Sequence, residues 1–171
     1  ELIFGTYNNA LHVLKLDSTE AGGFPVTFSQ RIRYGAAVAD IDGDGIAEII
    51  AGNEANELHA LTGAADSLTG FPVSLTDAIS AAPVILKHAG SSYIIVPLQD
   101  QKMIILDGEG SLLVSYDAAA PIEYPAALAD LDGDLVPDII FTDSDGLLHA
   151  INIAGESIGS FPVALSAVPK T

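Results

Sequence analysis

Cysteine and tryptophan are absent from the sequence, and basic residues are scarce: six lysines and arginines stand against 23 acidic residues. The lack of cysteine excludes disulfides, thiolate catalysis and zinc–sulfur sites. Phosphate backbones and anionic membrane surfaces are bound by clustered cations, and a chain of net charge −17 has none to cluster. We therefore expect no nucleic-acid partner, whereas a cation is a good candidate ligand. The lack of tryptophan weakens a sugar-binding interpretation.

Long apolar runs are also missing, because the longest are strand-sized stretches such as "YIIVPL" and "MIIL". A membrane span needs roughly 20 apolar residues, so we expect no membrane insertion. No basic-then-apolar leader opens the chain, so we expect any signal peptide to have been removed or to lie outside it. The 171 residues, 49% of them hydrophobic and 17% charged, are enough for one globular domain or for part of a larger one.

The chain consists of four copies of one repeat. "ELIFGTYNNALHVLKLD" begins at residue 1, "EIIAGNEANELHALTGA" at 48 and "DIIFTDSDGLLHAINIA" at 138, and a weaker copy, "YIIVPLQDQKMIILDGE", begins at 93. The spacings are 47, 45 and 45 residues. Each strong copy is followed by "GFPV" or "SFPV", and the weak copy has "SLLVSYD" there.

Short strands are predicted within each repeat, because apolar runs alternate with turn residues and no sustained 3.6-residue period is present. Four short antiparallel strands per unit of about 45 residues predict an all-β fold, the β-propeller. A solenoid with one helix per repeat is the competing architecture, and the lack of helical periodicity argues against it. We expect the "FPV" strand to be outermost, because proline is tolerated at a sheet edge, and the Ala-rich strand that precedes each acidic stretch to be innermost.

We predict a single propeller segment whose repeats span residues 1–35, 36–79, 80–123 and 124–171. The first repeat begins at the second strand of a blade, so the chain is expected to hold about four blades less one strand. Two arrangements follow from this count. The chain is either a piece of a larger propeller, or a half that pairs with another copy of itself as a homodimer.

Two nearly identical acidic stretches, "ADIDGDGIAEII" at 39–50 and "ADLDGDLVPDII" at 129–140, lie at equivalent places in the second and fourth repeats. Alternating carboxylates on a tight glycine turn point inward and converge. Calcium accepts about six to eight such oxygen donors in flexible geometry, whereas magnesium tolerates crowded all-protein cages poorly. We predict two calcium sites. The candidate ligands are four side chains and one backbone carbonyl per loop: Asp40, Asp42, Asp44, Glu48 and the Ile46 carbonyl, then Asp130, Asp132, Asp134, Asp138 and the Val136 carbonyl.

Two other interpretations of these stretches are a solvated acidic turn and an EF-hand. A solvated acidic turn would explain one such stretch, but two in register between equivalent strands favour metal binding. An EF-hand shares positions 1, 3 and 5 but needs an acid at position 12. That position is Ala51 in one loop and Phe141 in the other, so we reject the EF-hand.

The "DxDGDG" loops followed by "AEIIAG" and "PDIIFT", and the "LIFG" of the first copy, resemble the FG-GAP (VCBS-like) repeat family. This family includes the propeller blades of integrin α-subunits and of many bacterial surface proteins. The resemblance covers nearly the whole chain and implies calcium held by the same side chains. Two departures stand out: "KHAGSSY" replaces the loop in the third blade, which should bind no metal, and Leu135 stands where glycine is usual. The lack of cysteine favours a bacterial or archaeal surface protein over an animal one.

Three features that imitate catalytic or ligand sites are better explained by structure. "GESIG" matches the nucleophile elbow around Ser157, but the repeat alignment places it in a turn. His12, His59 and His149 recur at one blade position that Ile104 fills in the weak copy, which indicates packing. Paired carboxylates could serve a glycosidase, but a general acid needs a raised pKa that a bound cation would oppose.

We therefore expect a non-enzymatic, extracellular or cell-surface calcium-binding module that presents a propeller face to a protein or glycan. The alternatives are an accessory propeller domain of a secreted enzyme, such as a polysaccharide lyase or a protease, and a structural spacer in a surface assembly. The sequence names neither the ligand nor the total number of blades.

Overall fold

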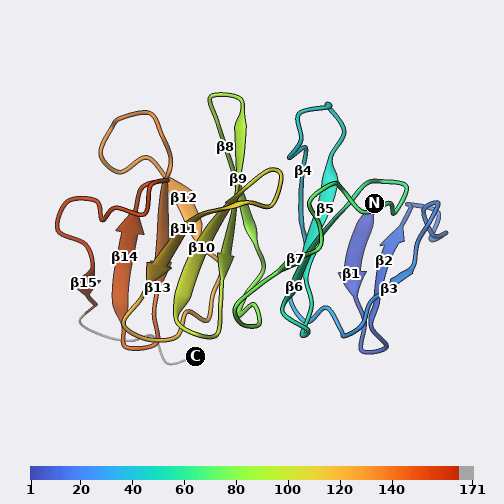
Figure 1. The fold of residues 1–171 in the computed structure, drawn as a ribbon, viewed down its shortest axis with the longest axis horizontal. Coiled ribbons are helices and arrows are strands. Elements are labelled where there is room, and N and C mark those ends of the chain that lie inside the picture. The colour runs from blue at the N-terminus through green and yellow to red at the C-terminus, as the bar shows by residue number, and fades with distance from the viewer. Residues whose placement is uncertain (166–171) are drawn as a thin grey trace.

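The computed structural model describes residues 1–165, and within them the regular elements are fifteen strands and no helix. The strands form four antiparallel sheets in which hydrogen-bonded neighbours are also neighbours in sequence. Figure 1 shows the sheets standing side by side in chain order, from β1 at one side to β15 at the other. We call them blades 1 to 4. This arrangement confirms the predicted all-β propeller architecture.

The blades have three, four, four and four strands, so the first lacks its innermost strand, as predicted. Blade 1 contains β1 (Leu2–Gly5), β2 (Ala10–Leu14) and β3 (Val26–Thr27). Blade 2 contains β4 (Ala37–Ala39), β5 (Glu48–Gly52), β6 (Glu57–Leu61) and β7 (Val73–Ser74). Blade 3 contains β8 (Val84–His88), β9 (Ser91–Pro97), β10 (Lys102–Asp107) and β11 (Leu112–Asp117). Blade 4 contains β12 (Ala127–Ala129), β13 (Asp138–Thr142), β14 (Leu147–Ile151) and β15 (Val163–Ala164).

The outer edges of blades 1, 2 and 4 have the proline that the sequence pattern predicts. The short strands β3, β7 and β15 each pair on one side only and follow a Phe–Pro bond that is cis, so proline stands just before an edge strand. At the opposite edge, the Ala-rich β4 contacts β8 of the next blade. The small residues of β4 thus lie against the first strand of blade 3, whose own residues are larger.

Blade 3 differs from the others at both ends of its sheet. A tight turn through Ala89 (φ 49°) and Gly90 (φ 82°) joins β8 to β9, and the pairing continues up to His88 and Ser91. Both turn residues have positive φ, which is what a two-residue hairpin of this kind requires. The outer strand β11 has six residues where β3, β7 and β15 have two. The weak third copy is therefore a blade with a plain hairpin in place of a loop.

Hydrophobic cores lie between the blades, because alternate residues of each strand point to opposite faces. In β5, Ile49 packs with blade 1 and Ile50 packs with blade 3. In β9, Ile94 belongs to the core with blade 2 and Ile95 to the core with blade 4. Burial of such a side chain stabilises the fold by about 1.5–3 kcal/mol. Contacts between blades, made face to face, therefore hold this structure together.

Candidate metal centres

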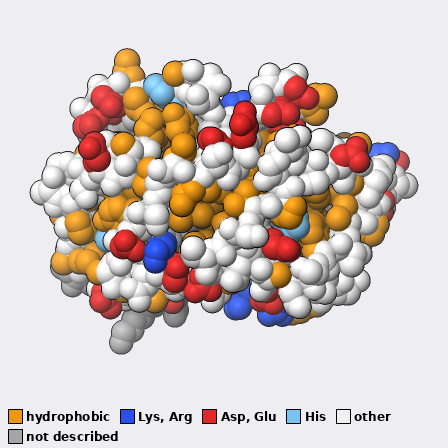
Figure 2. All heavy atoms as spheres, in the orientation of Figure 1, with side chains coloured by type: hydrophobic (Ala, Val, Ile, Leu, Met, Phe, Trp, Pro, Cys, Tyr) orange, Lys and Arg blue, Asp and Glu red, His pale blue; other side chains and the backbone are white. Residues whose placement is uncertain are grey.

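The two acidic loops connect the first strand of a blade to its second. One joins β4 to β5 in blade 2 and the other joins β12 to β13 in blade 4. Figure 1 shows both loops at the same edge of the molecule, with the β8–β9 hairpin of blade 3 between them. Figure 2 shows acidic side chains along this edge and also on the lower half of the same face. The fold therefore places two equivalent acidic sites on one side of the blades.

Asp side chains shape the first loop by accepting hydrogen bonds from backbone N–H groups that follow them. Asp40 Oδ1 accepts from Gly43 N at 2.7 Å, and Asp44 Oδ1 accepts from Ile46 N at 2.7 Å. Asp42 Oδ1 accepts from the Asp44 N–H at 3.1 Å. Gly43 and Gly45 have φ of 83° and 89°, a conformation that glycine adopts without steric cost. The loop is thus folded by its own sequence.

The second loop repeats this pattern closely. Asp130 Oδ1 accepts from Gly133 N at 2.7 Å, and Asp134 Oδ1 accepts from Val136 N at 2.7 Å. Leu135, at the place of Gly45, takes the same left-handed conformation with φ 70°. Its N–H donates to Asp130 Oδ2 at 3.1 Å. The substitution of leucine for glycine therefore leaves the path of the loop unchanged.

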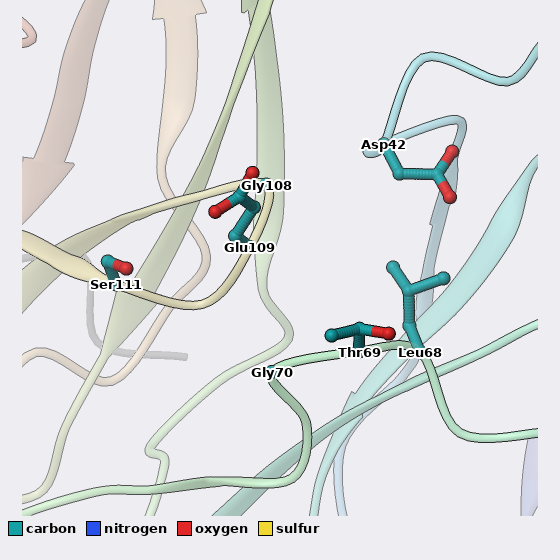
Figure 3. A pocket seen from close by; sticks show the side chains of 7 residues that line it. All are labelled: Asp42, Leu68, Thr69, Gly70, Gly108, Glu109 and Ser111. Atoms are coloured by element: carbon teal, nitrogen blue, oxygen red, sulfur yellow. The ribbon is translucent and has the colours of Figure 1, made fainter.

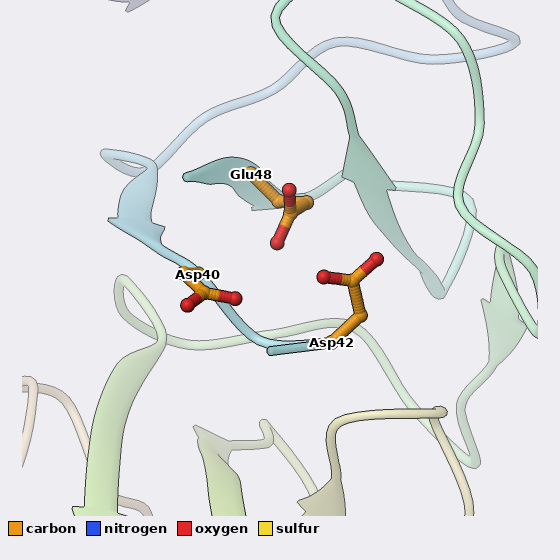
Figure 4. Close-up of side chains that lie close together, drawn as sticks. All are labelled: Asp40, Asp42 and Glu48. Atoms are coloured by element: carbon orange, nitrogen blue, oxygen red, sulfur yellow. The ribbon is translucent and has the colours of Figure 1, made fainter. Parts of the chain in front are cut away.

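Three carboxylates converge in each loop, as Figure 4 shows for the first. Within each group, one ligand atom from every residue lies within 4.8 Å of the others; the groups are Asp40, Asp42 and Glu48 in blade 2, and Asp130, Asp132 and Asp138 in blade 4. Asp44 and Asp134 fall outside these groups. They stay predicted ligands, as do the Ile46 and Val136 carbonyls.

The last carboxylate of each group is almost completely buried. Glu48 is 1% exposed and Asp138 is 2% exposed. Each accepts one hydrogen bond from the backbone of its own loop: Glu48 Oε2 from the Ile41 N–H at 2.9 Å, and Asp138 Oδ2 from the Leu131 N–H at 2.8 Å. Glu48 and Asp138 therefore bind the loop backbone in the same way, although their side chains differ in length. A buried carboxylate that stays charged with only one hydrogen bond is destabilised, and a cation beside it would relieve this cost.

The charges in the first loop fit a cation. Burial raises the pKa of Glu48, and repulsion from Asp42, Asp44 and Asp40 raises it further, although the Ile41 N–H opposes the shift. The pKa of Asp40 is lowered, first by the Gly43 N–H and then by Lys87, whose Nζ lies 3.3 Å from Asp40 Oδ2. All three converging groups offer oxygen, the donor that calcium prefers. The residues present thus fit calcium.

The first loop also packs against blade 3. Ile41 is 4% exposed and belongs to the core between blades 2 and 3. Ser92 of β9 lies with its Oγ 3.4 Å from the Asp40 carbonyl oxygen. At the equivalent place in blade 4, Leu131 is 46% exposed. The first site is therefore built into a boundary between blades, whereas the second lies on a free face of the described residues.

A cleft of about 400 Å³ opens beside the first site, between blades 2 and 3. Figure 3 shows Asp42 on one wall and Glu109, from the β10–β11 turn, on the other. A second hollow of about 320 Å³ continues past Asp42 and Glu109 to Lys87 and Asp107. The sequence analysis missed this cleft, because Glu109 belongs to a different repeat and no motif connects it to the acidic loop.

Comparison with known proteins identifies the architecture. No protein-family model matches the sequence, and no curated protein matches it. Among solved structures, BamB from Moraxella catarrhalis superposes with a TM-score of 0.70 at 18% identity, over 92% of this chain and 44% of that one. BBS1N in complex with ARL6DN superposes with a TM-score of 0.70 at 12% identity, over 94% of this chain and 48% of that one.

A third match is a protein of unknown function from Bacteroides caccae, with a TM-score of 0.57 at 15% identity, over 92% of this chain and 55% of that one. BamB and BBS1N are β-propellers, so the fold of this chain is a β-propeller. The chain spans about half the length of these neighbours.

Ser157 and the three histidines lie in the structural settings that the repeat alignment predicts. Ser157 lies between two turns and bridges Ile151, and residues 158–165 after it form no helix. The three histidine side chains are 22%, 12% and 2% exposed for His12, His59 and His149, and each has a polar partner. His149, the most buried, lies 3.1 Å from Asp143 Oδ2 and 3.0 Å from the Tyr116 hydroxyl. In the described residues, no helix is long and apolar enough to cross a membrane.

Proposed function

We propose that this chain is a non-enzymatic, calcium-binding β-propeller module of the FG-GAP (VCBS-like) kind, which works outside the cell or at its surface by binding a protein partner. One observation carries the proposal. The same three acidic positions converge in two loops of separate blades, and in each loop the most buried carboxylate has a single backbone hydrogen bond.

Calcium would be held by the converging carboxylates of each loop, with the remaining Asp and backbone carbonyl completing its shell. The ion would supply the positive charge that the buried Glu48 and Asp138 lack. It would also fix the first loop against blade 3, where Ile41 is buried. The role of the metal is thus to fix the conformation of both loops and to hold the first loop against blade 3. It takes no part in chemistry.

The proposed extracellular setting sets the expected affinity of the two sites. Extracellular calcium modules bind with dissociation constants of about 0.1–1 mM. At about 1 mM calcium, binding would stabilise the folded state by about 0.4–1.4 kcal/mol per site. Calcium would therefore rigidify this propeller, while the cores between the blades supply most of its stability.

The proposed partner is a protein that presents a basic group. Asp42 and Glu109 line both the cleft and the second hollow beside the first loop, and the second hollow adds Asp107 and one basic residue, Lys87. Such a lining favours a lysine or arginine side chain over an anion. Of the similar propellers, BBS1N was solved in complex with ARL6DN, which supports a protein partner for this fold. The same acidic side chains are held for a cation, so we propose no catalytic role for them.

Native mass spectrometry in calcium tests the proposal. The wild-type chain should carry two calcium ions, the single variants Asp42→Ala and Asp132→Ala one each, and the double variant none. A matched control, Asp66→Ala with Glu123→Ala, removes two exposed acids outside the loops and should keep both ions. A folded wild-type chain that carries no calcium would overturn the assignment, and so would a control that loses ions as the double variant does.

A further inference from the structure

A lysine of blade 3 reaches the first acidic loop, which belongs to blade 2. Lys87 Nζ lies 3.3 Å from Asp40 Oδ2. Lys87 stands opposite Ser92 in the register of the β8–β9 hairpin, and the Ser92 hydroxyl donates to the Asp40 carbonyl oxygen at 3.4 Å. Opposite residues of an antiparallel pair share one face of the sheet. One residue pair of blade 3 therefore contacts both the side chain and the backbone of Asp40.

The ion pair is made with one of the proposed calcium ligands. Asp40 is one of the three carboxylates that converge in this loop, with Asp42 and Glu48 (Figure 4). Its Oδ1 accepts a hydrogen bond from the Gly43 N–H at 2.7 Å, and its other oxygen, Oδ2, is the one that Lys87 faces. A cationic group thus lies at the edge of the place proposed for the metal.

The ammonium group of Lys87 offsets part of the negative charge of the loop. Burial, together with repulsion from the three loop aspartates, raises the pKa of Glu48. The pKa of Asp40 is lowered, first by the Gly43 N–H and then by Lys87. Among the described residues, Lys87 is the one lysine or arginine that forms an ion pair with this loop. The chain has six basic residues in all, and one of them serves these carboxylates.

We infer that Lys87 is the resident counter-ion of the first acidic loop: its ammonium holds Asp40 when no metal is bound and gives up this carboxylate to a calcium ion, so that Lys87 sets the calcium affinity of the site. This inference rests on the proposed function. Two cations that face one carboxylate repel each other. Lys87 should therefore weaken calcium binding at the first site, by about three- to tenfold in dilute salt because the pair is partly exposed.

Lys87 can leave Asp40 at little cost. Its side chain is 50% exposed, and exposed ion pairs contribute little to stability. Lys87 lines the hollow of about 320 Å³ together with Asp107 and Glu109, so the same hollow offers other carboxylates to the ammonium. A lysine can also keep its methylene stem in place while its charged end moves. The exchange therefore needs a rotation of one side chain, and the hairpin can stay where it is.

Calcium titration of chains that keep only the first site tests the inference. The parent carries Asp132→Ala, which removes the second site, so that the measured Kd belongs to the first loop. In this parent, Lys87→Met removes the charge and keeps the length of the side chain, and it should bind calcium about three- to tenfold more tightly. Lys87→Gln should give the same result. Lys87→Arg keeps the charge and should bind as the parent does.

Lys102→Met is the matched control. It makes the same change of charge in the same blade, but Lys102 pairs with Asp100 and Asp117 and forms no ion pair with the loop. Its Kd for calcium should equal that of the parent. A gain in affinity as large as that of Lys87→Met would mean that net charge alone sets the affinity, and this result would overturn the inference.

Two further measurements separate a counter-ion from a residue that only supports the fold. The gain in affinity of Lys87→Met should shrink as salt rises from about 0.05 to 0.5 M, because salt screens exposed charges. In chelator, the amides of residues 41–48 should exchange hydrogen faster in Lys87→Met than in the wild type, because the carboxylates have lost their counter-ion. In saturating calcium the two proteins should exchange alike.

Unchanged or weaker calcium binding by Lys87→Met overturns the inference, and so does a gain in affinity that is insensitive to salt. These results would leave the calcium sites themselves in place, since the parent would still carry one ion. A folded parent that takes up no calcium is a different result, because it contradicts the proposed function and the inference falls with it. Native mass spectrometry of the parent distinguishes the two cases.

Discussion

Ile41 and Gly108 are in direct contact: a Cβ atom on Gly108 would lie 2.1 Å from the Ile41 carbonyl oxygen. Ile41 belongs to the first acidic loop and Gly108 to the β10–β11 turn of blade 3. The N–H of the same Ile41 donates to the buried Glu48. We therefore expect a movement of blade 3 against blade 2 to displace the carboxylates that would hold the metal.

Gly108→Ala should destabilise the protein and weaken calcium binding at the first site. The added methyl group cannot fit against the carbonyl, so blade 3 or the loop must shift, at a cost of about 1–3 kcal/mol. Chemical denaturation measures the stability, and calcium titration measures the affinity. Gly63→Ala is the matched control, because Gly63 holds the equivalent place in blade 2 and has no atom within 4 Å of an added Cβ. Equal effects of the two substitutions would contradict the proposed contact.

Glu48→Gln should change stability in opposite directions with and without calcium. In chelator the variant should be more stable than the wild type, because the amide removes a buried charge beside Asp40 and Asp42 and keeps an acceptor for the Ile41 N–H. In saturating calcium it should lose the stabilisation of that site, about 1 kcal/mol. Thermal unfolding in chelator and in calcium measures both.

Two further variants serve as comparisons for Glu48→Gln. Asp138→Asn makes the equivalent change in the second loop and should show the same crossover. Glu123→Gln changes an exposed acid and should leave the response to calcium as in the wild type. The effect on stability should change sign between chelator and calcium at Glu48 and Asp138 only. A change of sign at Glu123, or no change of sign at either loop position, would mean that the carboxylates do not share a cation.

The fold was predictable from the sequence, because the strands and turns of each repeat are determined by residues close together in the chain. The period of about 45 residues, the turn residues between short apolar runs and the "FPV" edge strands each act within one blade, and the structure confirms them. The sequence also marked the third blade as the one without an acidic loop, because "KHAGSSY" stands there, and the structure has a plain hairpin at that place. The convergence of Asp40, Asp42 and Glu48 also follows from spacing within one loop.

Contacts between blades could not be predicted from the sequence. The ion pair of Lys87 with Asp40, the cleft wall formed by Glu109 and the burial of Ile41 all join residues from different repeats. Which residues meet depends on how two sheets pack, and no sequence motif indicates this packing. The three histidines illustrate the same limit: their burial was predicted from the Ile104 equivalence, but their polar partners were not.

Tyr116→Phe should destabilise the boundary between blades 3 and 4. The Tyr116 hydroxyl on β11 lies 3.0 Å from Nδ1 of the buried His149 on β14, whose other nitrogen lies 3.1 Å from Asp143 Oδ2. Removal of the hydroxyl leaves that nitrogen without its partner, at a cost of about 0.5–1.5 kcal/mol. Denaturant unfolding measures the loss. Tyr124→Phe, at a residue 55% exposed, should be neutral, and an equal loss there would show that the hydrogen bond adds nothing.

His59 should make the stability depend on pH in mildly acidic solution. Its burial lowers the pKa of the ring below the ordinary value of 6.5, although Glu57 opposes the shift. As the pH falls below 6.5, the unfolded chain binds a proton that the folded chain excludes, so unfolding becomes more favourable. The contribution of His59 is thus present in full above pH 6.5 and is lost toward the lower pKa of the folded state. Denaturant unfolding from pH 7 to pH 5 in saturating calcium should show the fall.

His59→Gln should make this pH dependence shallower, because glutamine does not titrate. The same substitution at His88, at the end of the β8–β9 hairpin, is the matched control. The difference in unfolding free energy between the wild type and His59→Gln should shrink as the pH falls. A parallel pair of curves would mean that His59 takes up its proton equally in both states. Burial beside Phe28, whose ring lies 4.5 Å away edge-on, would then not disfavour the charged imidazole, and the packing of blade 2 against blade 1 would be looser than the structure describes.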